Sequence, residues 1–194
     1  IAFAKKHLIL IVNDNPYSFI LNENPLSILE IEGAKEVAIE LNSLSKTFNM
    51  AGWRVGMVVG DPEIIKTILQ VKSNMDSGMF FGIQKGAVEA FKLSNDWFQS
   101  QNEIYKERRA IVWKIFDALN CTYDTSIGGL FVWAKLPKGM KSEDITDELL
   151  YNKNVFITPG TIFGSNGEGY VRASLCVDVE LLNEVLNRLT PVRI

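Results

Sequence analysis

The stretch NSLSKTFNMAGWRVG, at residues 42–56, decides how the rest of this chain is interpreted. Apolar runs typical of β-strands flank it, at residues 37–41 and 55–59. The segment between them is too polar for a protein core. It contains the side chains of Ser43, Ser45, Lys46 and Arg54. The pattern therefore predicts a functional loop between two strands.

Two strands joined without an intervening helix are more easily antiparallel than parallel. An antiparallel return would bring Arg54 back to the sheet edge that Ser43 has just left. Hydroxyl groups, backbone N–H groups and a guanidinium would then converge, which is the donor set that a phosphate group requires. A lysine beside such a site favours a Schiff base with a carbonyl compound that carries a phosphate. The alternative is a surface turn with a solvated lysine.

A second polar segment, NDNPY, follows the apolar run LILIV at residues 8–12. A run without polar alternation is typical of a strand buried on both faces of a parallel sheet. Ligands of open α/β sheets bind beyond the carboxyl ends of the strands, which is where Asp14 and Tyr17 stand. Asn-Asp-Asn-Pro is also ordinary turn chemistry. The strand at residues 37–41 delivers Lys46 to the same edge, and this favours a site.

SLSKTFNMAGWRVG resembles the lysine signature of the class I and II aminotransferases, which are fold type I enzymes that use pyridoxal 5′-phosphate (PLP). The resemblance implies that Lys46 is the catalytic lysine, which forms the Schiff base with PLP and moves the proton at the substrate Cα. It implies that the phosphate is held by Ser43, Ser45 and Arg54.

The same resemblance gives the NDNPY segment a role toward the cofactor. It implies that Asp14 bonds the pyridine nitrogen, keeping the ring cationic so that it acts as an electron sink. Tyr17 would touch the phenolic oxygen, although DNPY departs from the commoner DExY form of the motif.

Arg172 stands inside the apolar run at residues 170–175, after a glycine-rich loop and a second strand predicted at residues 155–158. An unpaired guanidinium is costly among apolar residues, so Arg172 needs an anion. The aminotransferase resemblance implies that this anion is the substrate α-carboxylate, held by a bidentate pair. The alternative is an internal salt bridge to an acid such as Glu168.

The fold expected from the resemblance is α/β, with two domains. Residues 1–100 would form the C-terminal part of a PLP-binding large domain, with a mostly parallel sheet and helices. Residues 101–194 would form a small α+β C-terminal domain that includes a connecting helix. The resemblance covers essentially the whole chain but corresponds only to the C-terminal half of an aminotransferase.

Helices are predicted at residues 2–7, after an N-cap at Asp61 followed by Pro62, at residues 97–119, from a cap at Ser142 to about residue 152, and from Asp178 to residue 189. The sequence LFVWAKL alternates as a half-buried antiparallel strand does. A cluster of large apolar side chains precedes residue 82, and a dimer interface is favoured for it over a pocket wall or a core: Met75, Met79, Phe80 and Phe81.

The composition is that of an ordinary globular protein, with 47% hydrophobic and 22% charged residues among 194. A net charge of −3 gives no basic surface for nucleic acid. No run is long enough to span a membrane, so a cytoplasmic location is expected. Cys121 and Cys176 are interpreted as reduced core residues, and a single histidine, His7, predicts no metal site.

The sequence therefore predicts a PLP-dependent aminotransferase that exchanges an amino group between an α-amino acid and a 2-oxo acid, as a homodimer. Two alternatives remain open. The first is a PLP-dependent lyase or decarboxylase, which would share the same cofactor anchors. The second is a non-catalytic, aminotransferase-like effector domain of a transcription regulator.

Overall fold

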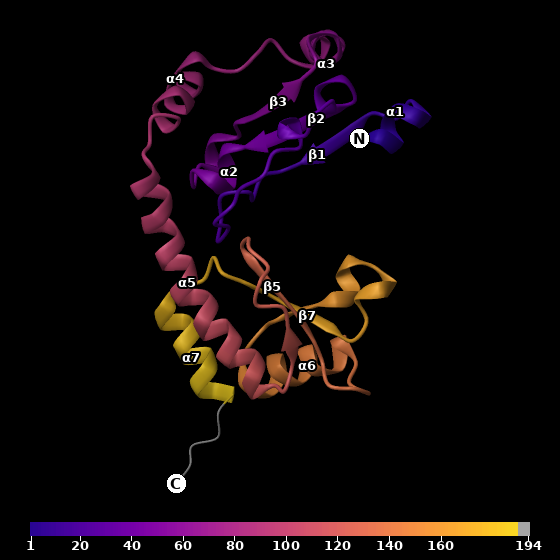
Figure 1. Ribbon diagram of the computed structural model, residues 1–194. Coiled ribbons are helices and arrows are strands. Elements are labelled where there is room, and N and C mark those ends of the chain that lie inside the picture. Colours follow the sequence, from indigo (N-terminus) through magenta and orange to yellow (C-terminus); the bar gives the residue numbers. More distant parts are fainter. Residues whose placement is uncertain (190–194) are drawn as a thin grey trace. The chain divides into compact units, whose positions relative to one another are not determined.

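The computed structural model describes residues 1–189, which form two compact units (Figure 1). The first unit is Ile1–Trp97, and the second begins at Phe98. Assigning these units to the large and small domains of an aminotransferase stays a prediction. None of the described helices is both long and apolar enough to cross a membrane.

The first unit contains one three-stranded sheet with short and long helices around it. Its elements are α1 (Ala2–His7), β1 (Ile11–Asp14), β2 (Ala38–Ser43), α2 (Leu44–Thr47), β3 (Gly56–Gly60), α3 (Pro62–Met75) and α4 (Phe81–Ala90). Short 3-10 turns lie at Ile28–Glu30, Ala34–Glu36 and Ala51–Trp53.

The central strand β2 pairs in parallel with β1 and antiparallel with β3. Asp14 lies opposite Leu41 in the first pair, and Ser43 lies opposite Gly56 in the second. The predicted antiparallel return after residues 42–54 is therefore confirmed. Because β1 and β2 are parallel, their carboxyl ends meet at one edge of the sheet, where β3 begins.

The strand predicted at residues 8–12 is wrong in its start and in its burial. β1 begins only at Ile11, because Leu8 adopts a left-handed conformation (φ 54°) and ends helix α1. Leu8 is 94% exposed and Val12 is 53% exposed. Burial alternates along β1: Ile11 and Asn13 on one face are partly buried, whereas the face that carries Val12 is not covered by other described residues.

Helix α2 is anchored by a small apolar cluster. Leu44, which is 1% exposed, packs with Val55, Ala87 and Ala90. Phe48 joins the cluster and contacts Phe91 edge-on, with 5.6 Å between ring centroids. Gly86 allows α4 to approach the Trp53 ring, since an added Cβ would collide with that ring. The loop that carries Lys46 and Arg54 is thus held against α4.

Local signals place several helices correctly. The Asp61 side chain accepts hydrogen bonds from the backbone N–H groups of Glu63 and Ile64, as expected of an N-cap. Asp178 likewise accepts from the N–H of Leu181 at the start of α7. The apolar cluster around Met79 lies on the surface of this chain, and its assignment to a dimer interface stays a prediction.

The second unit is an antiparallel sheet in the order β4-β5-β7-β6, with helices packed against it. Its elements are the end of α5 (Asn95–Ala118), then β4 (Thr122–Tyr123), β5 (Phe131–Lys135), α6 (Ser142–Lys153), β6 (Thr158–Pro159), β7 (Tyr170–Ser174) and α7 (Val179–Leu189). Helices α5 and α7 lie side by side (Figure 1) and together line one cavity. The alternating burial predicted for LFVWAKL is confirmed in β5.

Two predictions for this unit are wrong. Ser142 does not cap α6; it is fully buried, and its hydroxyl donates to the Gly167 carbonyl and accepts from the N–H groups of Gly169 and Tyr170. Cys121 is buried as predicted, but Cys176 is exposed, because β7 has ended before it and the chain is turning into α7. Both thiols are free.

Candidate functional site

Lys46 lies in α2, a helix of four residues that follows β2 without a break. The Ser43 hydroxyl caps this helix by accepting a hydrogen bond from the Ser45 N–H at 3.1 Å. Lys46 is half-buried, and its amine makes no hydrogen bond or ion pair with any residue in the described range 1–189. A primary amine held near a sheet edge without a partner is available for chemistry.

Arg54 returns to the same edge from the other side. It has a left-handed backbone conformation (φ 53°), which is uncommon for a residue other than glycine. The next carbonyl, that of Val55, accepts from the Leu44 N–H at 3.1 Å and fixes the return. Arg54 Nη1 donates to the Ala51 carbonyl at 3.1 Å, and the side chain is otherwise exposed. The remaining guanidinium donors can therefore reach an anion.

Asp14 is the last residue of β1, and its carboxylate is exposed. The ladder between β1 and β2 continues one residue further, because the Asn15 N–H donates to the Leu41 carbonyl at 2.9 Å. The segment then turns at Pro16, whose carbonyl accepts from the Thr47 hydroxyl at 3.3 Å. Tyr17 is half-buried in this turn. The Thr47 contact links the Asp14 segment directly to the Lys46 helix.

The fold thus brings the predicted residues of the first unit to one sheet edge. They are Asp14, Tyr17, Ser43, Ser45, Lys46 and Arg54. Sequence reasoning missed Thr47, although a hydroxyl directly after the lysine was visible in SLSKT.

Sequence reasoning also missed Glu40, a carboxylate inside the central strand. Glu40 is only 5% exposed, yet it lies in the apolar run VAIEL, where an acid is unexpected. Burial by itself would raise the pKa of Glu40, but hydrogen bonds from Ser27, Asn13, the Ile28 N–H and Asn15 outweigh it and lower that pKa. The carboxylate is therefore ionised at neutral pH. The acid within an otherwise apolar strand was the signal that could have found it.

Arg172 lies in the second unit, on the face of the sheet that carries Trp133, its register partner. Its guanidinium carbon is 4.2 Å from the centroid of the Phe131 ring and 4.2 Å from that of the Phe163 ring. No carboxylate in the described chain pairs with it. The two rings orient the guanidinium and leave its hydrogen-bond donors for an external anion.

The alternative pairing of Arg172 with Glu168 is wrong. The Glu168 carboxylate instead accepts from the backbone N–H of Ser142 at 2.9 Å and of Gly169 at 3.0 Å. These hydrogen bonds, that of Ser142 first, lower the pKa of Glu168. They tie the start of α6 to the turn before β7, so Glu168 has a structural role.

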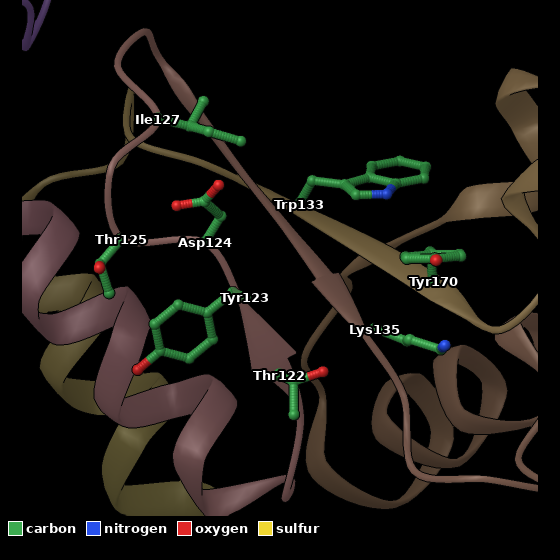
Figure 2. A pocket seen from close by; sticks show the side chains of 8 residues that line it. All are labelled: Thr122, Tyr123, Asp124, Thr125, Ile127, Trp133, Lys135 and Tyr170. Carbon is green, nitrogen blue, oxygen red and sulfur yellow. The ribbon is translucent and has the colours of Figure 1, made fainter.

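The same sheet face carries an open pocket of about 570 Å³ (Figure 2). Figure 2 shows Trp133, Lys135 and Tyr170 projecting from the strands, with Asp124 and Thr125 on the loop beside them. Trp133 stacks on Tyr170 with 5.4 Å between ring centroids. None of the residues predicted from the sequence lines this pocket. Among residues 1–189, no group of three or more His, Cys, Asp or Glu side chains gathers as a metal site would require.

Comparison with known proteins decides the family. The family model described as "Aminotransferase class I and II" matches residues 1–189. The chain belongs to this family. The resemblance found in the sequence is confirmed, and with it the α/β fold and dependence of the family on PLP.

Among individual relatives, the LL-diaminopimelate aminotransferase of Maridesulfovibrio salexigens is 41% identical over 193 residues, covering 98% of this chain and 50% of the relative. The enzyme of the same name from Aquifex aeolicus is 38% identical, covering 99% and 50%. The apo-BacF structure from Bacillus subtilis superposes with a TM-score of 0.87 at 38% identity, covering 97% of this chain and 49% of that one.

The chain therefore spans about half the length of the relatives it matches. These coverages give the extent of the match. The assignment of the chain to the C-terminal half of an aminotransferase stays a prediction from its motifs.

Proposed function

We propose that this chain is the lysine-bearing part of a PLP-dependent aminotransferase, which exchanges an amino group between an α-amino acid and a 2-oxo acid. The observation that carries the proposal is the position of Lys46. Its unpaired amine lies at the sheet edge where the Ser43 hydroxyl, the Arg54 guanidinium and the Asp14 carboxylate also end.

The donor set of this edge fits PLP. Two hydroxyls and a guanidinium with unused donors suit a phosphate dianion. An exposed carboxylate at the end of the neighbouring parallel strand suits a protonated ring nitrogen. When bound, PLP supplies an aldehyde carbon that bonds to amines and a cationic ring that draws electrons from the substrate Cα.

Each residue then has a role that follows from its chemistry. Arg54, Ser43 and Ser45 hold and orient the phosphate. Asp14 keeps the proton on the ring nitrogen, and Tyr17 contacts the phenolic oxygen.

The remaining two residues act on the substrate. Lys46 acts first as general base and removes the proton from the substrate Cα. It then acts as general acid and gives a proton back, which completes the transfer of the amino group. Arg172, oriented between Phe131 and Phe163, binds the substrate α-carboxylate.

The relatives named LL-diaminopimelate aminotransferases make LL-diaminopimelate the first substrate to test. Beyond its substrates, we propose that the protein works in the cytoplasm as a homodimer, without a nucleic-acid or membrane partner. Sedimentation of the intact protein as a monomer would contradict the dimer.

The deciding experiment uses the intact protein that contains this chain. Borohydride reduction should fix the cofactor on Lys46, as located by peptide mapping. Lys46→Ala should lose this adduct and lower turnover by about 10²- to 10⁴-fold, the usual contribution of a general base. Lys66→Ala is the matched control, because Lys66 is exposed on α3 and pairs only loosely with Glu63, at 3.8 Å.

The products separate the remaining chemistries. An aminotransferase accumulates the 2-oxo acid of its substrate together with an aminated cofactor. Release of ammonia or carbon dioxide in equal amount would instead assign a lyase or a decarboxylase. A cofactor adduct on another lysine, or none, would contradict the proposed role of Lys46.

A further inference from the structure

Glu40 is the centre of a buried hydrogen-bond network behind the proposed site. One carboxylate oxygen, Oε2, accepts from Asn13 Nδ2 at 3.1 Å, from the Ser27 hydroxyl at 2.8 Å and from the Ile28 N–H at 2.9 Å. The other, Oε1, accepts from Asn15 Nδ2 at 3.3 Å and Asn42 Nδ2 at 3.0 Å. All five groups are neutral donors.

This arrangement is specific to a carboxylate. A buried charge normally needs a cation, yet no lysine or arginine in the described residues forms an ion pair with Glu40. The five donors take the place of a cation, because each directs a partial positive charge at an oxygen that can only accept. A glutamine here would turn an amide NH₂ toward groups that themselves donate.

The donors come from the segments that carry the proposed catalytic groups. Asn13 and Asn15 flank Asp14, and Asn42 directly precedes Ser43. Successive side chains of a strand point to opposite faces. When Asn13, Asn15 and Asn42 are drawn to Glu40 on one face, Asp14 and Ser43 are therefore directed to the other face. Ser27 and Ile28 close the network from the loop beyond β1.

We propose that Glu40 is a positioning residue for the cofactor site: its buried carboxylate locks the ends of β1 and β2 together, so that Asp14 and Ser43 present their oxygens on the opposite face at a fixed spacing. The inference rests on the proposed function for the roles of Asp14 and Ser43. The locking of the strand ends can be measured without the cofactor.

The first test is Glu40→Gln in the intact protein, with Thr146→Val as the control. Thr146 is a buried hydroxyl in the second unit, 4% exposed and bonded to the Ser142 and Ile157 carbonyls. Its replacement also removes buried hydrogen bonds, but far along the chain from Asp14. Without cofactor, Glu40→Gln should speed amide hydrogen exchange across residues 11–15 and 41–43, and the control should leave exchange there unchanged.

The second readout is PLP itself. Glu40→Gln should weaken PLP binding by roughly 10-fold or more, by analogy with the scale seen when a group that orients a metal-binding residue is removed. It should also move the alkaline fall of kcat to lower pH, because a misplaced Asp14 holds the ring proton less firmly. The Thr146→Val variant should change neither.

A milder variant covers the case in which Glu40→Gln does not fold. Ser27→Ala removes the 2.8 Å hydroxyl donor to Glu40, together with the acceptor for the Leu29 N–H at 3.2 Å, and leaves the carboxylate in place. Ser27→Ala should also speed amide hydrogen exchange and weaken PLP binding, but by less than Glu40→Gln does. If the foldable variants match Thr146→Val in exchange, PLP affinity and pH profile, the positioning role is refuted.

The outcomes separate this inference from the proposed function. If the unmodified protein binds no PLP and Lys46 carries no adduct, the proposed function fails, and faster exchange in Glu40→Gln would still establish the lock between the strands. If Lys46 carries the adduct and Glu40→Gln behaves as the control does, only the role of Glu40 fails.

Discussion

Leu44→Ala should uncouple the lysine helix from its support. Leu44 is 1% exposed and packs with Val55, Ala87 and Ala90, while partly buried Phe48, Met50 and Ile83 complete the cluster. A helix of four residues has no stability of its own, since isolated helices shorter than about 12 residues are marginal in water. The position of Lys46 therefore depends on the packing of Leu44.

The expected loss follows from the atoms removed. Leucine has three more side-chain carbons than alanine, and at about 0.8 kcal/mol for each buried carbon this gives about 2.4 kcal/mol. The cavity left behind adds to this, so the free energy of unfolding should fall by about 3 to 4 kcal/mol in total, within the range seen for buried leucines.

Urea unfolding of the intact protein, followed by far-UV circular dichroism, measures this loss. PLP affinity should fall with it, because the Lys46 helix is no longer fixed. Leu26→Ala is the control: Leu26 is 73% exposed, and its truncation should cost less than about 0.5 kcal/mol. A loss below about 1 kcal/mol for Leu44→Ala, with PLP binding unchanged, would refute the reasoning that packing of this one side chain holds the helix.

Three further predictions concern the second unit. Arg172→Ala should weaken the binding of substrates that carry an α-carboxylate by about 2 to 5 kcal/mol. The measurement is kcat/KM for these substrates and for amines without a carboxylate, whose turnover should hardly change. Equal impairment of both would assign Arg172 a structural role. Burial, with a further contribution from the Asp117 carboxylate, raises the pKa of Tyr123 to about 12 from an ordinary value of 10.0. The unfolded chain then loses the phenol proton first, so stability should decline between about pH 10 and 12, and Tyr123→Phe should remove that part of the decline in unfolding titrations. Burial raises the pKa of the Cys121 thiol to about 11, while Cys176 is exposed. A thiol reagent should therefore label Cys176 quickly in the native protein and Cys121 only on unfolding. Equal labelling rates of the two thiols in the native protein would contradict the burial of Cys121.

Features set by neighbouring residues were predictable from the sequence. The caps at Asp61 and Asp178 depend on a side chain and the N–H groups two or three residues later, so the sequence alone was sufficient. The antiparallel return of β3 followed from the short connection after β2. The motif around Lys46 was recognisable for the same reason, because its site residues lie within twelve positions of one another.

The tertiary structure alone decided which groups separated in sequence become partners. Glu40 accepts from Asn13, 27 residues away, and the Ser142 hydroxyl accepts from the N–H of Tyr170, 28 residues away. The guanidinium of Arg172 lies against two aromatic rings, Phe131 of β5 and Phe163 of the 3-10 turn Gly160–Phe163, whereas the sequence had left pairing with an acid such as Glu168 open as the alternative. A sequence shows that a buried charge needs compensation, but which donors supply it depends on strand register and on packing, and these are fixed only when the whole sheet forms.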